Sequence, residues 1–262
     1  MIRWTEAADA MLPGQPADRM IGRAHGPHPS RPLLEWLEDV RASDAARVGG
    51  RAAALGEMYS ALRGPGTDHP EGFVITVDGW DCLLDTAVNG GAWDLVGAEL
   101  RAVCPVAFHN TTLRQALEQV LDEANPEDQL DLHMRAALAR ALVLASPVPE
   151  PVARALGEGF KHLLHISEGD AEVAVHASVV PDTPAMPSFT GQYESYLDVH
   201  GVPGLQAAWR KCCASSFTGR ALGYQLRRGM DPLARRLGVL ITRMARSSRA
   251  YADRENVGGV RY

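Results

Sequence analysis

The spacing of hydrophobic and polar positions predicts that helices and strands are mixed along the whole chain. Short runs rich in β-branched residues predict strands over 72–77, 171–175, 192–199 and 238–241. Apolar residues at helical spacing predict helices over 33–37, 50–62, 128–145, 150–164 and 205–228, the last interrupted at Gly219. Because both kinds of element occur throughout, the expected fold class is α/β or α+β.

Capping and breaking residues predict further boundaries. Asp78 is expected to cap a helix that begins at Gly79, and residues 110–112 are expected to cap another helix that runs to about Glu123. Residues 1–32 contain five prolines and no sustained periodicity. That segment is therefore expected to be an irregular extension.

The composition is that of an ordinary globular protein and excludes several classes of partner. Hydrophobic residues make up 46% and charged residues 22% of the 262 residues, which is enough for a sizeable core. The net charge of −6 gives no general attraction to nucleic acid or to anionic lipid, so neither is expected as a partner. No run approaches the roughly 18 apolar residues that span a bilayer. The start, Met1 to Glu6, lacks the features of a secretory signal, so a cytoplasmic protein is expected.

The cysteines lead to one further expectation, and the lysine content is unusually low. The four cysteines are Cys82, Cys104, Cys212 and Cys213. They are scattered and have no histidine at ligand spacing, so reduced cysteines buried in the core are expected. Only two of the 26 basic residues are lysine, so arginine has replaced lysine across the chain.

Two glycines precede the helix predicted over 50–62. Gly49 and Gly50 leave backbone N–H groups free to approach an anion, and the helix dipole adds partial positive charge there. Arg51, in the first turn, could then reach a phosphate. A plain turn has the same pattern, so both interpretations stay open.

A second polar segment follows the strand predicted over 171–175. His176 and Ser178 stand after that strand, and a glycine-containing loop then leads to the next predicted strand. A polar side chain at the end of a strand, followed by such a loop, can bracket a nucleotide. An ordinary loop between strands fits this pattern as well.

The order of the motifs is more specific than any one of them. The chain contains, in order, GGR-x3-LGEM, GFVITVDGW, EGDAEVAVHAS, SFTGQYESYLDV and CCASSFTGRALGYQLRRGMD. This series resembles the nucleotide-binding domain of the family that includes phosphoenolpyruvate synthase, pyruvate phosphate dikinase and rifampicin phosphotransferase. The resemblance covers about residues 33–244, which are expected to form one ATP-binding lobe. Residues 1–32 are then an extension, and residues 245–262 a basic tail.

The resemblance implies an ATP-grasp fold, in which two lobes close over ATP and metal and a phosphoryl group passes to a mobile histidine domain. Such chemistry needs cations on the phosphates and carboxylates on Mg²⁺. Arg51 stands where the family has its phosphate-binding lysine, and either drift or tuning for phosphate explains the exchange. His176 stands where the family has the arginine of its AVRSS motif. A group with a reference pKa of about 6.5 thus replaces a permanent cation, which implies a weakened triphosphate site.

Other positions of the motifs are partly kept. Ser178 matches the second serine of AVRSS, while Ala177 replaces the first. Gly191 and Ser195 match the glycine and the threonine of the family's loop. Thr242 stands where the family has a glutamine near the adenine. The ATP site implied by the resemblance consists of Arg51, His176, Gly191, Ser195 and Thr242.

The resemblance also implies parts that lie beyond this sequence. After Met244 the family continues into a second lobe that holds Mg²⁺, and it also has a phosphohistidine domain. We therefore expect ATP as the ligand, Mg²⁺ only where a partner supplies ligands, and a partner protein that carries the second lobe or the phosphohistidine domain.

Two functions stay open at this point. The first is an ATP-dependent kinase or phosphotransferase component. The second is a non-catalytic pseudoenzyme that acts as a scaffold or regulatory subunit, which the joint changes at Arg51, His176 and Ala177 favour. If His176 contacts phosphate only when protonated, nucleotide affinity should strengthen as the pH falls from about 8 to 6. His162 and His165 lie three residues apart on a predicted helix without a third ligand nearby, so a packing or surface role is favoured over a metal site.

Overall fold

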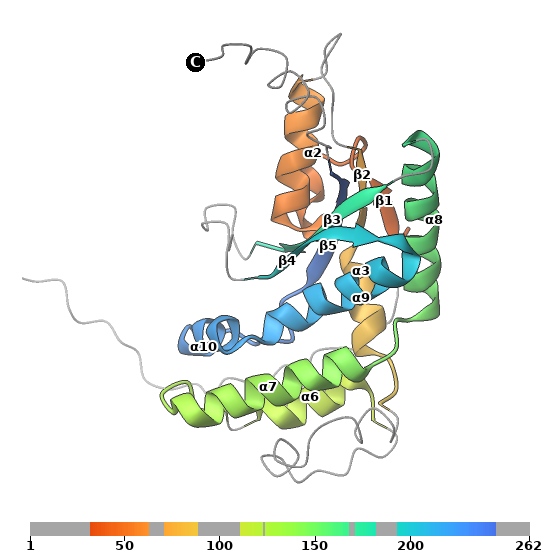
Figure 1. The fold of residues 1–262 in the computed structure, drawn as a ribbon. Coiled ribbons are helices and arrows are strands. Elements are labelled where there is room, and N and C mark those ends of the chain that lie inside the picture. The colour runs from red at the N-terminus through yellow and green to blue at the C-terminus, as the bar shows by residue number, and fades with distance from the viewer. Residues whose placement is uncertain are drawn as a thin grey trace, which may run out of the picture.

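A single antiparallel sheet forms the centre of the protein. The computed structural model describes residues 32–62, 71–88, 111–122, 124–167, 171–181 and 193–244. Five strands pair in the order β1-β2-β5-β3-β4, and every pairing is antiparallel (Figure 1). The strands are β1 (Leu34–Trp36), β2 (Gly72–Ile75), β3 (Glu172–Val179), β4 (Ser195–His200) and β5 (Leu237–Arg243). The mixture of helices with an antiparallel sheet confirms an α+β fold.

The helices of the described residues lie on both sides of this sheet. They are η1 (Ala42–Asp44), α1 (Ala45–Val48), α2 (Gly50–Leu62), α3 (Val77–Leu84), α6 (Leu113–Leu121), α7 (Gln129–Ala145), α8 (Glu150–Ile166), α9 (Gly201–Ala214), η2 (Ser215–Phe217) and α10 (Gly219–Arg227). The predicted helices over 50–62, 128–145 and 150–164 agree with α2, α7 and α8 to within two residues.

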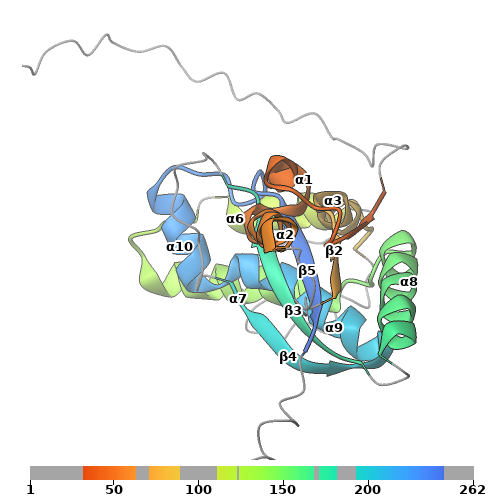
Figure 2. The ribbon, with the colours of Figure 1, turned by 90° about the horizontal axis from the view of Figure 1, so that it is seen from above.

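The two faces of the sheet carry helical layers of unequal size (Figures 1 and 2). α2 lies against one face, where a small core forms around Val74 of β2 and Leu240 of β5. α3, α8 and α9 lie against the other face, which contributes Phe73, Val175 and Ile241 to the main core. α6, α7 and α10 pack behind them and thicken this side of the molecule.

The alternation of side chains in β3 explains this division. Val173, Val175 and Ala177 are buried in the main core. Residues between them in the strand point to the opposite face, because successive side chains of a strand alternate. Ser178 therefore faces α2, and its hydroxyl contacts that helix.

One close approach between layers depends on a glycine. α8 crosses β2 where Gly159 lies against the ring of Phe73. A Cβ atom at Gly159 would come within 2.6 Å of that ring, so any larger residue would push the helix away from the sheet.

Several sequence expectations need correction. The segment predicted as a helix over 33–37 contains β1, because Leu34–Trp36 pair with β2 at the edge of the sheet. Asp78 does not cap its helix, since α3 begins at Val77 after Thr76 and Asp78 lies in the first turn. β3 continues to Val179, so His176 lies inside a strand rather than after one.

The helical stretch predicted over 205–228 with an interruption at Gly219 is two helices, and the second begins at Gly219. α9 begins earlier than predicted, at Gly201, and the chain turns through η2 before α10 begins. The apolar stripe of α9, which includes Leu205 and Trp209, is buried as expected. Thr218 starts α10 by accepting a hydrogen bond from the amide of Ala221.

The remaining organisational expectations are partly tested. Cys212 and Cys213 are free and buried, as predicted, and Cys82 is free and half-buried. Cys104 lies outside the described residues. So do residues 1–31 and 245–262, and the expected extension and tail therefore stay predictions. None of the described helices combines the length and apolar character that crossing a membrane requires.

Candidate functional site

The N-terminus of α2 meets the end of β3. Gly49 has a φ of 80°, and a Cβ atom there would overlap the backbone carbonyl of Ser178. The amide of Ala52 donates a hydrogen bond to the buried hydroxyl of Ser178 at 3.0 Å. A side chain 126 positions away in the sequence thus caps α2, and it satisfies one of the amides that the first turn of a helix leaves open.

Three of the residues implied by the motifs lie on the same face of the sheet as this cap. His176 of β3 is paired with Ser195 of β4 and with Leu240 of β5. Thr242 of β5 is paired with Ala174, two residues before His176 in the same strand. Paired residues of antiparallel strands point to the same face. His176, Ser195 and Thr242 therefore all lie on the face that α2 covers.

The exposure of these residues suits a site that opens to solvent. Arg51 and Ser195 are exposed, and His176 and Thr242 are half-buried. Arg51 lies close enough to His176 to act on it electrostatically. Gly191 lies outside the described residues, so its expected place in the loop before β4 stays a prediction.

His176 carries no charge at neutral pH in the unliganded protein. Burial, together with the nearby charge of Arg51, lowers the pKa of its imidazole to about 4. In the unliganded protein His176 is therefore neutral from pH 8 to 6, so a rise in nucleotide affinity over that range would require bound phosphate to raise this pKa. Burial also lowers the pKa of Arg51, but a guanidinium stays charged at any physiological pH.

The imidazole of His176 has an unused polar atom. Its Nδ1 is buried and has no hydrogen-bond partner among the described residues. A buried polar atom without a partner costs about 1–3 kcal/mol, so such atoms are normally paired with protein, water or ligand. This orphaned nitrogen points to a polar ligand atom or an ordered water on the α2 face.

Two other arginines, one in α1 before α2 and one just before β5, are already engaged. Arg47 of α1 forms an ion pair with Glu35 of β1. Arg236, which precedes β5, binds Asp78 at 2.9 Å and also binds Asp81. Among the described residues, Arg51 has no carboxylate partner, so its charge is available to an anion.

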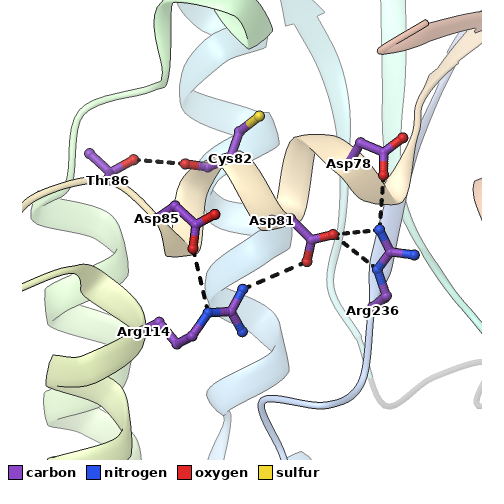
Figure 3. A network of polar contacts seen from close by, with 7 residues as sticks. All are labelled: Asp78, Asp81, Cys82, Asp85, Thr86, Arg114 and Arg236. Atoms are coloured by element: carbon purple, nitrogen blue, oxygen red, sulfur yellow. Dashed lines mark hydrogen bonds and ion pairs between the residues drawn. The ribbon is translucent and has the colours of Figure 1, made fainter. Parts of the chain in front are cut away.

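Sequence patterns did not reveal the network around Asp81 (Figure 3). Arg236 joins the start of β5 to Asp78 and Asp81 on α3. Arg114 of α6 approaches Asp81 at 3.8 Å and Asp85 at 3.5 Å. The only signal in the sequence is the spacing of the three aspartates, which places them along one side of a helix. The network ties α3, α6 and β5 together.

Mg²⁺ was expected only where a partner supplies ligands, and His162 and His165 were expected to pack or to lie at the surface. No group of three or more His, Cys, Asp or Glu side chains in the described ranges could hold a metal ion. The described residues therefore do not by themselves fit Mg²⁺. The ring of His162 lies 4.4 Å from that of Trp36, which is a packing contact.

Comparison with known proteins gives a consistent result. A phosphoenolpyruvate synthase of Synechocystis sp. is 29% identical over 228 residues, which cover 85% of this chain and 25% of that protein. The phosphoenolpyruvate synthases of Escherichia coli and Aquifex aeolicus are 28% and 30% identical, and the matches cover 84% and 83% of this chain. They cover 25% and 23% of those two proteins, so the chain spans about a quarter of the length of these relatives.

A domain family matches the part of the chain that contains the glycine turn, the capped helix and the polar face of β3. The family described as the AMP/ATP-binding domain of pyruvate phosphate dikinase matches residues 45–262, a range that includes Arg51, His176, Ser195 and Thr242. The chain belongs to the family of pyruvate phosphate dikinase AMP/ATP-binding domains.

Proposed function

We propose that this chain is the ATP-binding component of a phosphotransferase that resembles phosphoenolpyruvate synthase. The observation that carries the proposal is the meeting of an available cation, Arg51, with the orphaned Nδ1 of His176 at the N-terminus of α2. Within a family of AMP/ATP-binding domains, this is where a phosphate chain would bind.

The start of α2 offers backbone donors as well as charge. Ser178 occupies the amide of Ala52, and the amides of Gly50 and Arg51 belong to the same first turn, where a phosphate would find donors. The helix dipole adds partial positive charge at the same point. Neutral His176 can still donate or accept one hydrogen bond, although it supplies no charge to the triphosphate.

Further side chains offer contacts to an adenosine group and to a neighbouring lobe. Thr242 and Ser195 offer hydroxyl groups on the α2 face. Met58 and Leu62 of α2 are 45% and 55% exposed, and Leu197 of β4 is 59% exposed. Apolar side chains left uncovered in this way mark an interaction surface. We assign them to contact with the second lobe that the family resemblance implies, on a partner polypeptide.

The partner would also supply the chemistry that these residues lack. Mg²⁺ bound to ATP phosphates stabilises the charge that develops in phosphoryl transfer. In this proposal the metal ligands and the phosphohistidine acceptor reside on the partner. Arg51, the α2 amides and His176 bind and orient the phosphates.

A second candidate function is a pseudoenzyme that binds nucleotide as a scaffold or regulatory subunit. The low pKa of His176 favours it, because the site then holds one fixed cation at neutral pH where the family motif has two. Ala177 also removes a hydroxyl that the family motif supplies. Both functions require the chain to bind nucleotide, but only the first requires ATP to be consumed.

Calorimetry with ATP, with and without Mg²⁺, tests the shared part of both functions. Wild-type protein should bind ATP, and Arg51→Ala should weaken binding by about tenfold or more, the effect of losing one charged hydrogen bond. Arg154→Ala is the matched control, because Arg154 is an exposed arginine on α8 that pairs with Glu150. Equal affinity of wild type and Arg51→Ala would contradict the site.

Turnover separates the two functions. ATP consumption by the protein together with its co-purifying partner, abolished by Arg51→Ala, would exclude the pseudoenzyme. ATP binding without consumption in the same mixture would support it.

A further inference from the structure

A charged cluster lies beneath the start of β4, on the face opposite the candidate site. Glu194 directly precedes β4. Arg140 of α7 reaches both oxygens of its carboxylate, with Nη1 3.3 Å from Oε1 and Nη2 3.3 Å from Oε2. Such a two-point contact fixes the orientation of the carboxylate as well as its position. Arg140 Nη1 also donates to the carbonyl of Ala214 at 3.3 Å, which anchors the arginine to the end of α9.

Neighbouring residues contact Glu194 and Tyr196 from other directions. The hydroxyl of Tyr196 donates a hydrogen bond to Glu194 Oε2. Burial and this hydrogen bond raise the pKa of Tyr196, so the hydroxyl stays a donor. Cys212 Sγ lies 3.8 Å from the carbonyl of Glu194, and Lys211 Nζ lies 5.5 Å from the centre of the Tyr196 ring. Glu194 is thus held by both α7 and α9.

The alternation of side chains along β4 links the contacts of Glu194 to the opposite face of the sheet. Glu194 and Tyr196 point toward α7 and α9, and Ser195 lies between them in sequence. Ser195 therefore points to the other face, where it lies opposite His176. A shift of Glu194 would move the hydroxyl of Ser195 relative to His176.

We propose that Arg140 is a positioning residue for the nucleotide site, because it holds Glu194 and thereby fixes Ser195 opposite His176. The identity of the ligand rests on the proposed function, whereas the placement of β4 by Arg140 does not. Arg140 itself lies on α7, behind the sheet, and contacts no residue of the site.

A general stabilising role does not account for the cluster. The side chains of Arg140 and Glu194 are 27% and 40% exposed. Ion pairs this accessible add little to global stability because solvent screens them. The effect of the pair should therefore be local, at β4, and should appear in nucleotide affinity more than in overall unfolding.

The test combines hydrogen exchange with ATP binding in Arg140→Gln, Glu194→Gln and the double variant. Arg140→Gln should speed amide exchange in residues 193–199 and weaken ATP binding by roughly three- to thirtyfold, the range for residues that act on a site without touching it. Arg140→Lys keeps the charge but loses the two-point contact, and its effect should be intermediate. The double variant should be no worse than either single variant, since Arg140 acts through Glu194.

Each outcome bears on the proposal. Arg154→Gln is the matched control and should change neither measurement. Unchanged exchange in 193–199, or effects of Arg140 and Glu194 that simply add, would overturn the proposal. Wild-type protein that binds no ATP would contradict the proposed function, while faster exchange at β4 in Arg140→Gln would still support the placement of Ser195 by Arg140.

Discussion

At the scale of single residues, His176 and Arg51 set the electrostatic character of the site. The family resemblance implies two permanent cations at these positions, where this chain has Arg51 and His176. The imidazole of His176 is half-buried beside a guanidinium, and both conditions oppose a second positive charge. The site therefore presents a fixed cation beside a neutral hydrogen-bonding group.

The low pKa of His176 makes folding stability depend on pH. In the unfolded chain the imidazole takes up a proton at about pH 6.5, whereas in the folded protein it does so only at about pH 4. The unfolded state thus binds more protons between these values, so the free energy of unfolding should fall as the pH falls through this window. From pH 7 to 5 these two pKa values correspond to about 2 kcal/mol, and solvent screening of the half-exposed imidazole reduces this to about 1 kcal/mol. Wild type should therefore lose about 1 kcal/mol more than His176→Gln.

Urea unfolding at the two pH values measures this difference. His165→Gln is the matched control, because His165 is exposed on α8. If wild type and His176→Gln lost the same free energy of unfolding, His176 would have an ordinary pKa.

At the scale of elements, the junction between α2 and β3 shapes the site. A helix that begins with glycines starts weakly unless its first amides find partners. Here the hydroxyl of Ser178 provides one partner from the neighbouring strand. The positive φ of Gly49 and its contact with Ser178 allow the helix to begin directly against the sheet.

Loss of this cap should destabilise the protein. Ser178→Ala leaves the amide of Ala52 without its partner, and we expect the free energy of unfolding to fall by about 1–2 kcal/mol. Ser195→Ala, at an exposed position on the same face, should change it by less than about 0.5 kcal/mol. Urea unfolding at pH 7 compares the two variants, and equal effects would rule out a capping role for Ser178.

At the scale of the whole molecule, the Asp81 network joins layers that the sheet does not connect (Figure 3). Arg236 and Arg114 approach Asp81 from β5 and α6. Burial nevertheless raises the pKa of Asp81, so desolvation outweighs the help from both arginines. The carboxylate is therefore costly to keep charged in this position.

Because burial makes the charge of Asp81 costly, replacing Arg236 and replacing Asp81 should change the free energy of unfolding by different amounts. Arg236→Met leaves two aspartates without their main cation, and we expect the free energy of unfolding to fall by about 1–3 kcal/mol. Asp81→Asn removes the buried charge itself and should cost less than Arg236→Met. Thermal and urea unfolding at pH 7 measure both, with exposed Arg154→Met as the control. A larger loss in Asp81→Asn would show that the carboxylate stabilises the fold.

Local patterns predicted the elements best where local energetics dominate. α7 begins at Gln129, directly after Asp128, whose side chain accepts hydrogen bonds from the amides of Leu130 and Asp131, and such caps are visible in the sequence. The segment over 33–37 was predicted as a helix because its apolar spacing is ambiguous over five residues. Its pairing with β2, about 40 positions away in the chain, decides in favour of a strand.

The motifs identified most of the candidate site, although they did not reveal its chemistry. The order of the motifs in the sequence named Arg51, His176, Ser195 and Thr242. It could do so because each motif of the family corresponds to a particular stretch of this chain. The protonation state of His176 and the role of Arg140 depend on burial and on contacts between distant segments. No local pattern encodes such contacts.

The amino-acid order thus predicted the family and the mixed fold class and named candidate site residues, because these depend on motifs and on hydrophobic spacing within single elements. Folding brings α2 against β3, lowers the pKa of His176 and places Arg140 behind Ser195. Desolvation and ion pairing depend on how closely segments far apart in the chain approach one another, and that distance exists only once the layers have packed.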